Sequence, residues 1–180
     1  AKLPGVALTI IGDGSQRDEL ESLFAGTNTH FTGYLLGDEL PAACASADVF
    51  LFTGPNETFG QVIQEAMASG LPTLVTNKGA VHDLVVEGES GFICQENTTA
   101  FADAVRHLRD NPDLRQKMAT IARHIAESRP WEVILSQLEG YYTEAQQINE
   151  RFVRVFGTTD YHFPLKLPNL FMDNFRTPHM

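Results

Sequence analysis

Two glutamates, Glu57 and Glu65, stand eight positions apart across the predicted start of a helix. Gly60 lies between them and lets a ligand approach the backbone, where the first N–H groups of a helix have no partner within it. These donors and the positive end of the helix dipole attract phosphate, and ionised carboxylates accept strong hydrogen bonds from hydroxyl groups. The spacing therefore suits a nucleoside diphosphate sugar. By spacing alone, a solvated loop charge and an unrelated charge on the helix face are the commoner explanation.

The residues around this pair resemble a known family. Glu57 to Glu65, with Thr58, Phe59 and Gly60 between them, is similar to the E-x7-E signature of retaining GT-B glycosyltransferases of glycosyltransferase family 4. The resemblance covers roughly residues 4 to 145, and it favours bacterial lipid mannosyltransferases, with sulfoquinovosyl transferases next. The other matching segments are residues 33–34, 37–40, 45–50, 53–55 and 66–72.

The resemblance implies a role for each matching residue. Glu57 would bind hydroxyls of the transferred sugar and Glu65 the ribose, while the backbone of residues 58–61 would face sugar and phosphate. The loop at residues 33–34 would border the base. No side chain would act as a nucleophile, because the leaving group is thought to depart on the face that the acceptor attacks. The expected site residues are Glu57 (also the catalytic residue), Thr58, Phe59, Gly60, Gln61, Glu65, Gly33 and Tyr34.

The expected reaction is transfer of a hexose from a nucleotide sugar, with GDP-mannose favoured over a UDP-sugar, to a lipid or saccharide acceptor. In the family, an Arg and a Lys that grip the diphosphate precede the strand that starts here at Val6, and a separate N-terminal domain binds the acceptor. Residues 1–100 hold three Lys or Arg against 13 Asp or Glu, which argues against nucleic-acid binding and leaves a diphosphate poorly compensated. We therefore expect a fragment that transfers no sugar alone and binds nucleotide weakly, at about millimolar affinity.

Short β-branched runs alternate with helical patterns up to about residue 98, and three helical patterns follow. The alternation predicts an α/β fold, a Rossmann-like parallel sheet flanked by helices that lacks its first strand, with C-terminal helices. Ligands of such sheets bind beyond the carboxyl ends of the strands, where Glu57 falls. The expected strands are residues 6–11, 30–32, 49–52, 73–76 and 91–94; the expected helices begin at Ser15, capped with Asp18, and cover 39–46, 60–69, 99–110, 113–128 and 131–147.

The sequence predicts a nucleotide-sugar-binding domain over residues 1–147 and a tail over residues 148–180. The tail is rich in Phe without a clear period, so we expect no folded domain there. It could pack across the domain, contact a partner or a membrane, or be loosely ordered. Trp131 resembles the aromatic that opens the family's terminal helices, or is a core tryptophan.

No cofactor or metal is expected. The segment 12–14 invites a dinucleotide interpretation, but Arg17 stands where G-x-G-x-x-G has its third glycine. None of the six His pairs with carboxylates or cysteines at ligand spacing. The resemblance implies the same, because GT-B enzymes usually offset the leaving diphosphate with backbone dipoles and basic side chains.

The sequence predicts a cytoplasmic protein, with peripheral membrane association of the full protein left open. No stretch reaches the roughly 18 apolar residues of a spanning helix, and Cys44 and Cys94 fit reduced, buried thiols. Two other functions remain open. One is a sugar-nucleotide 2-epimerase of the same fold, whose acid and base residues we do not find. The other is a catalytically silent GT-B module, which would not need both glutamates.

Overall fold

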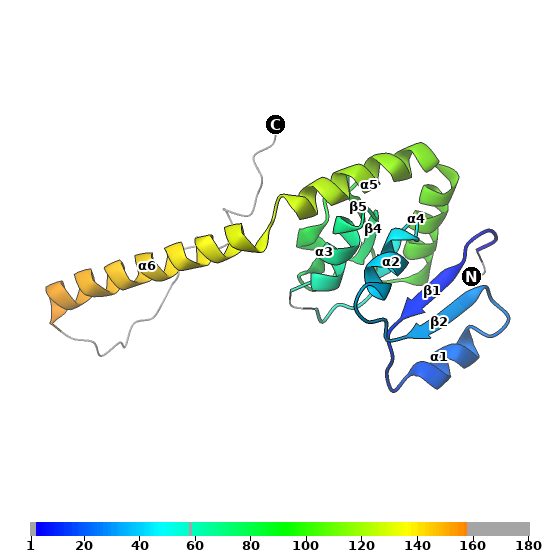
Figure 1. The fold of residues 1–180 in the computed structure, drawn as a ribbon, viewed down its shortest axis with the longest axis horizontal. Helices are drawn as coiled ribbons and strands as arrows, with labels where there is room; N and C mark the ends of the chain where they lie inside the picture. The colour runs from blue at the N-terminus through cyan, green and yellow to red at the C-terminus, as the bar shows by residue number, and fades with distance from the viewer. Residues whose placement is uncertain (1–2, 58, 158–180) are drawn as a thin grey trace. The chain divides into compact units, whose positions relative to one another are not determined.

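The computed structural model describes residues 3–57 and 59–157, and it divides the chain into two compact units, Ala1–Pro130 and Trp131–Met180. In the first unit strands alternate with helices, whereas the described part of the second unit is one long helix, α6 (Trp131–Phe156) (Figure 1). The first unit holds, in chain order, β1 (Leu8–Ile11), α1 (Arg17–Leu23), β2 (Thr29–Gly33), α2 (Glu39–Ala45), β3 (Phe50–Phe52), α3 (Gln61–Ala68), β4 (Thr73–Thr76), the 3-10 helix η1 (Val81–Leu84), β5 (Gly91–Cys94), α4 (Thr98–Asp110) and α5 (Pro112–Glu127).

All strand pairs among these elements are parallel, and they form two sheets. β1 pairs with β2, and β3, β4 and β5 form a second sheet with β4 in its centre. Phe52 lies opposite Val75, and Thr76 lies opposite Cys94. The predicted α/β fold with parallel strands and flanking helices is confirmed, although the strands lie in two sheets and not in one. That a further strand belongs to this fold stays a prediction.

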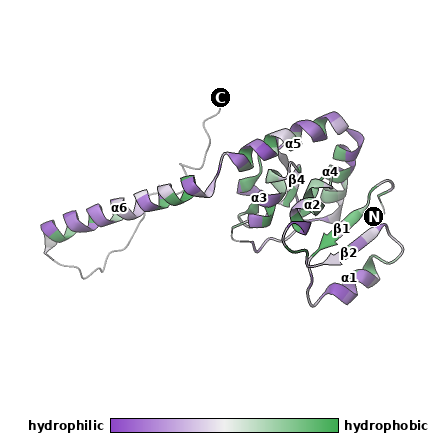
Figure 2. Cartoon of the chain, viewed as in Figure 1, coloured by the Kyte–Doolittle hydropathy of each residue, from purple (hydrophilic) through white to green (hydrophobic). Residues whose placement is uncertain are grey.

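The core lies on both faces of the three-stranded sheet. All four residues of β4 are buried, because successive side chains of a strand point to opposite faces and helices cover both. Val75 packs in a cluster with Ile63 and Met67 of α3. Leu74 packs in a second cluster that includes Leu108 of α4. By contrast, α1 and α2 have no buried residue, and Figure 2 shows α1 as mostly hydrophilic.

Several element ends differ from the sequence prediction. α1 starts after Gln16, which makes no capping hydrogen bond with its side chain, so the cap predicted at Ser15 with Asp18 is wrong. The short helix η1 was not predicted. α6 continues to Phe156, nine residues beyond its predicted end, so the first part of the predicted tail is helical. The division of the chain at residue 147 stays a prediction, and residues 158–180 lie outside the described residues.

Candidate functional site

Glu57 lies in the loop between β3 and α3, residues 53–60, which we call the glutamate loop. Its Oε1 atom accepts hydrogen bonds from the backbone N–H groups of Phe59 and Gly60, each over 3.0 Å. Hydrogen bonds to a charged acceptor are stronger than those between neutral groups, so the two donors fix the carboxylate against its own loop. Two of the N–H groups that we expected to face a ligand therefore bind Glu57 in this structure.

Gly60 turns the glutamate loop into α3. It has φ 68° and ψ 32°, a left-handed conformation that glycine adopts at no steric cost. A Cβ atom at this position would overlap the Cδ1 atom of Leu84 in η1. The next N–H groups, those of Gln61 and Val62, have no acceptor within α3 because the helix begins there. The start of α3 therefore offers outward-pointing donors beside the Glu57 carboxylate.

Glu65 lies one turn into α3, with an exposed side chain. Its Oε1 atom accepts a hydrogen bond from Nε2 of Gln61 over 3.2 Å. Cys44 of α2 lies near enough to sense this glutamate: burial, and secondly the charge of Glu65, raise the pKa of the Cys44 thiol. The prediction that the two glutamates span the start of a helix is confirmed.

The loop after β4 packs against the glutamate loop. Because β3 and β4 run parallel with Phe52 opposite Val75, the chain leaves the two strands at neighbouring points. A Cβ atom at Gly79, where φ is 72°, would overlap the backbone carbonyl of Pro55. Only glycine fits this contact. The roles of Gly79 and Leu84 could not be read from the sequence, since a contact between segments far apart along the chain has no local signal.

Gly33 is the last residue of β2 and Tyr34 follows it, and both contact the turn after β1. The carbonyl of Gly33 accepts a hydrogen bond from the N–H of Gly12 over 2.8 Å. The Tyr34 hydroxyl donates to the carbonyl of Asp13 over 3.1 Å. The Tyr34 ring is 72% exposed, and the Arg17 side chain comes close to Gly33. These contacts join the ends of β1 and β2 in one corner with an exposed aromatic ring.

The predicted site residues thus fall into two groups, one on each sheet. The group at the start of α3 contains Glu57, Phe59, Gly60, Gln61 and Glu65, and the group at the end of β2 contains Gly33 and Tyr34. Both groups follow carboxyl ends of parallel strands, which is where ligands of open α/β sheets bind. Thr58 lies outside the described residues. Which part of a ligand each residue holds stays a prediction.

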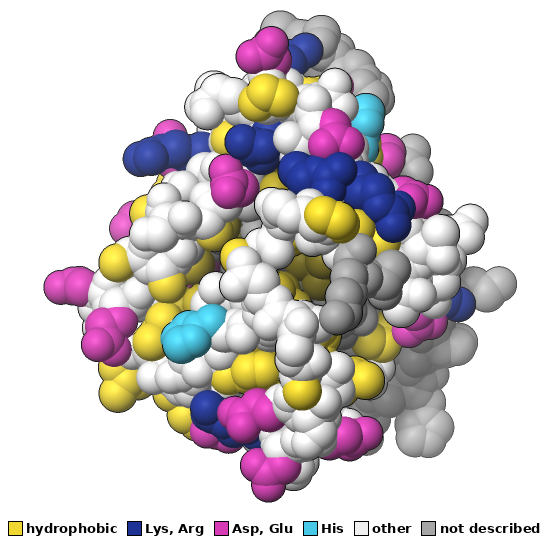
Figure 3. All heavy atoms as spheres, turned by 90° about the vertical axis from the view of Figure 1, so that its right-hand side faces the viewer, with side chains coloured by type: hydrophobic (Ala, Val, Ile, Leu, Met, Phe, Trp, Pro, Cys, Tyr) yellow, Lys and Arg dark blue, Asp and Glu magenta, His cyan; other side chains and the backbone are white. Residues whose placement is uncertain are grey.

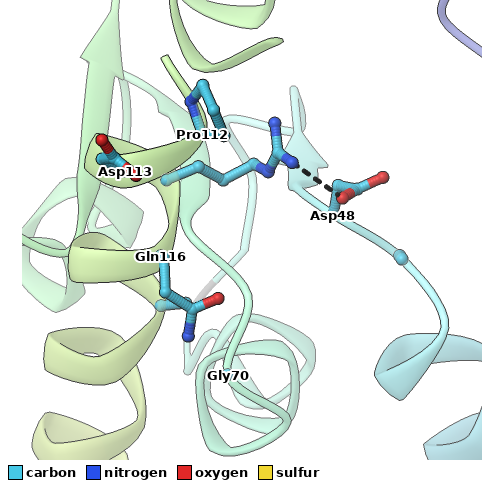
Figure 4. A pocket seen from close by; sticks show the side chains of 8 residues that line it. Asp48, Gly70, Pro112, Asp113 and Gln116 are labelled. Atoms are coloured by element: carbon cyan, nitrogen blue, oxygen red, sulfur yellow. Dashed lines mark ion pairs between the residues drawn. The ribbon is translucent and has the colours of Figure 1, made fainter.

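A polar cavity of about 340 Å³ lies at the opposite ends of the strands (Figure 4). Its wall includes an ion pair of 3.3 Å between Arg115 of α5 and Asp48 before β3. Gly70, which follows α3, lines it as well. Because Asp48 precedes β3 and Gly70 precedes β4, the cavity is at the amino ends of the strands and does not belong to the group around Glu57.

The Lys and Arg side chains are distributed unevenly. On the face drawn in Figure 3, most of them gather in the upper part, the side on which Figure 1 shows α4 and α5. Arg17, near the first turn, makes ion pairs of 2.9 Å with Asp13 and 2.8 Å with Glu21, and these hydrogen bonds raise its pKa. The positive charge of Arg17 is therefore already offset by two carboxylates.

Residues 3–57 and 59–157 also bear on metal binding and on membrane insertion. Within them, no group of three or more His, Cys, Asp or Glu residues lies close enough together to hold a metal ion. That the protein needs no metal ion stays an expectation. No helix in the same part of the chain combines the length and the apolar character needed to cross a membrane.

Comparison with known proteins identifies relatives over most of the chain. The family described as "Glycosyl transferases group 1" matches residues 1–125. A GDP-mannose-dependent alpha-mannosyltransferase of Mycobacterium tuberculosis (strain CDC 1551 / Oshkosh) is 41% identical over 139 residues, which are 76% of this chain and 35% of the relative. The sulfoquinovosyl transferase SQD2 of Arabidopsis thaliana is 37% identical over 143 residues, 76% of this chain and 28% of the relative. The chain thus spans about a third of the length of these relatives.

Solved structures show the same fold. A sucrose-phosphate synthase from Thermosynechococcus elongatus superimposes with a TM-score of 0.72 at 23% identity, over 81% of this chain and 40% of that one. Anabaena HepE in complex with UDP-glucose superimposes with a TM-score of 0.69 at 25% identity, over 80% and 42% of the two chains. With the family match over residues 1–125 and these relatives, the chain belongs to the glycosyl transferases group 1 family.

Proposed function

We propose that this chain is the donor-binding part of a retaining glycosyltransferase, which transfers a hexose from a nucleoside diphosphate sugar to a lipid or saccharide acceptor. The observation that carries the proposal is the geometry at the start of α3. There a carboxylate fixed by two backbone N–H groups, outward-pointing helix donors and a second, exposed carboxylate lie within nine residues of chain. Few other ligands combine hydroxyl groups at two ends with phosphate between them.

The two glutamates divide the work in this proposal. Glu57 accepts hydrogen bonds from hydroxyls of the transferred sugar, while the N–H groups at the helix start bind phosphate oxygens, which the helix dipole favours. Glu65 accepts hydrogen bonds from the ribose hydroxyls. Glu57 acts at the reacting sugar as a positioned acceptor and not as a nucleophile.

We propose GDP-mannose as the donor, with a UDP-sugar as the next candidate. Relatives named as GDP-mannose-dependent alpha-mannosyltransferases, from Mycobacterium tuberculosis, Mycolicibacterium smegmatis and Corynebacterium glutamicum, are 41%, 38% and 33% identical to this chain. HepE, which binds UDP-glucose, is 25% identical. Titrating the chain with GDP and with UDP under the same conditions tests this choice, and tighter binding of UDP would contradict it.

Binding of a nucleoside diphosphate tests the role of Glu65. Replacing its charge in Glu65→Gln should weaken GDP affinity by one to two decades, because hydrogen bonds to charged groups contribute about 1.5–3 kcal/mol. Glu89→Gln is a matched control, since Glu89 is exposed and lies before the amino end of β5, whereas the glutamate loop follows the carboxyl end of β3. Calorimetry that finds equal affinities for Glu65→Gln and Glu89→Gln would remove Glu65 from the site.

Turnover by the full-length protein tests the role of Glu57 and the reaction class. Glu57→Ala should lower the rate of sugar transfer by orders of magnitude and leave GDP affinity nearly unchanged, as loss of a contact made mainly in the transition state does. Equal loss of GDP binding in both glutamate variants would contradict the division of roles. With labelled GDP-mannose and a lipid extract, labelled lipid supports transfer, whereas an altered sugar nucleotide indicates epimerisation and no product indicates a silent module.

A further inference from the structure

Lys78 lies beside the glutamate loop. It comes three residues after Val75 in β4, and Pro55 comes three residues after Phe52 in β3; Phe52 and Val75 lie opposite each other. Neighbouring strands are about 4.8 Å apart, and the contact between Gly79 and the Pro55 carbonyl keeps the two loops together beyond the strands. Lys78 is therefore one strand away from the start of α3, at the same end of the sheet.

The backbone of Lys78 is anchored while its side chain is exposed. Its N–H donates to the hydroxyl of Thr76 over 3.3 Å, and Thr76 is fully buried. No ion pair involves Lys78 within the described part of the chain. The side chain of a lysine is a flexible four-carbon stem with a compact charge. An anchored backbone with a flexible ammonium suits the capture of an anion.

The charges around this end of the sheet make Lys78 unusual. The loops that follow the five strands are residues 12–16, 34–38, 53–60, 77–80 and 95–97, and Lys78 is the only Lys or Arg in them. They also contain four acidic residues, Asp13, Asp38, Glu57 and Glu96. Arg17, the nearest basic residue after the first loop, is already offset by its two carboxylate partners. These loops would repel a doubly charged diphosphate at the start of α3, and Lys78 is the one cation within them to offset its charge.

We propose that Lys78 binds the diphosphate of the donor and offsets its charge from the β4 side of the glutamate loop. This proposal rests on the proposed function, because it needs the diphosphate at the start of α3. It makes Lys78 a substrate-binding residue of the same site. Its flexible side chain brings the ammonium toward the phosphate oxygens from the loop after β4.

The test compares ligands with and without phosphate. GDP and guanosine are titrated, by NMR chemical shifts, into the 180-residue chain and into its Lys78→Ala, Lys78→Arg and Lys117→Ala variants. Lys117 is a matched control, since it is exposed on α5, makes no ion pair within the described residues and loses the same charge. Lys78→Ala should weaken GDP binding about tenfold, or about 1.4 kcal/mol, and leave guanosine binding unchanged. Lys78→Arg should keep most of the affinity, and added salt should reduce the difference.

Each outcome has a distinct meaning. If the parent chain binds GDP and Lys78→Ala binds it equally well, the proposal for Lys78 is wrong while the proposed function stands. The proposal for Lys78 is also wrong if Lys78→Ala weakens GDP and guanosine equally, or if Lys117→Ala has as large an effect on GDP. If the parent chain binds neither GDP nor UDP, the proposed function fails, and the proposal for Lys78 fails with it.

Discussion

The two parallel sheets of the first unit are built from similar strands that are covered very differently. β1 and β4 are both four residues long and mainly apolar or β-branched, yet β4 is buried at every position whereas β1 alternates between half-buried and exposed. β4 has a strand on each side and helices on both faces, while β1 pairs with β2 alone. The place of a strand in its sheet, and not its apolar content, decides how much of it is buried.

The two groups of candidate site residues differ in burial in the same way as the two sheets. Glu65 belongs to α3 and Glu57 to the loop before it, and Ile63 and Met67 of α3 pack in the core of the three-stranded sheet. Tyr34 follows the two-stranded sheet, where Gly33 is the one residue of the β1–α1–β2 segment that is buried. Segments with few buried contacts open more readily than core strands and helices. We therefore expect the glutamate group to be the more stable half of the site.

The largest expected effect comes from core truncation in the two sheets. Leu74→Ala in β4 should lower the free energy of unfolding by about 2–5 kcal/mol, because Leu74 is fully buried and its loss leaves a cavity. Leu8→Ala in β1 removes a half-buried side chain and should cost clearly less, about 1–2 kcal/mol. Urea denaturation of both variants measures the two changes. Equal losses would show that β1 is as well covered in solution as β4.

The second prediction compares two glycines with nearly the same backbone angle. Gly79 has φ 72° and Gly33 has φ 71°, so alanine in either position loses about 1–2 kcal/mol to the left-handed conformation. At Gly79 the new Cβ would also overlap the Pro55 carbonyl, a backbone atom, whereas at Gly33 it would meet only the end of the Arg17 side chain at 3.4 Å. Gly79→Ala should therefore cost about 1–3 kcal/mol more, measured by thermal or urea unfolding.

Gly88→Ala provides the control for this pair. Gly88 has φ 75°, and a Cβ there meets nothing within 4 Å, so it measures the backbone contribution alone. Gly33→Ala should resemble this control. If Gly79→Ala loses no more stability than Gly88→Ala, the glutamate loop shifts without a cost in stability. The contact between Gly79 and Pro55 then does not position Glu57.

The sequence predicts the local elements well where the chain's own signals decide them. The bounds of β4 and β5 agree with the prediction to the residue, because each is a short run of apolar and β-branched residues between Gly or Pro signals. The helix that carries Glu65 ends as predicted before Gly70, which has φ 78°. The polar and apolar pattern beyond Gln147 continues as a helix, and the prediction stopped there because the Phe-rich end was treated as one segment.

The site could be predicted only in part, because its geometry depends on contacts between distant residues. The glutamate pair follows from the sequence. Two of the site's contacts depend on loop conformation and strand register. One is the hydrogen bonding of the Glu57 carboxylate to N–H groups of its own loop, and the other is the close packing of Gly79 against the Pro55 carbonyl. The separation of β1 from β3 could not be derived from the alternation of elements either, since this pattern fixes strand direction and not every neighbour.

The third prediction probes the corner of the two-stranded sheet. Tyr34→Phe removes the hydroxyl that donates to the Asp13 carbonyl over 3.1 Å. A neutral hydrogen bond at an exposed residue contributes about 0.5–1.5 kcal/mol, and the expected loss is near the lower end. Hydrogen exchange should quicken at the Gly12 amide, which bonds to Gly33, and stay unchanged in β4. Quicker exchange in both sheets would show that they open as one unit and would contradict the comparison.

The smallest effect on stability is expected at the cavity near the amino ends of the strands in the three-stranded sheet. Asp48→Asn breaks the ion pair with Arg115, but Asp48 is 78% exposed, and exposed ion pairs contribute about 0–1 kcal/mol. Arg115 also donates from its NH1 group to the Leu108 carbonyl over 3.0 Å, so it stays anchored without Asp48. We expect a loss below about 0.5 kcal/mol that vanishes at high salt. A larger loss of stability that persists at high salt would mean that the ion pair between Asp48 and Arg115 stabilises the packing of α5 against β3. The three-stranded sheet would then depend on this polar contact as well as on its apolar core.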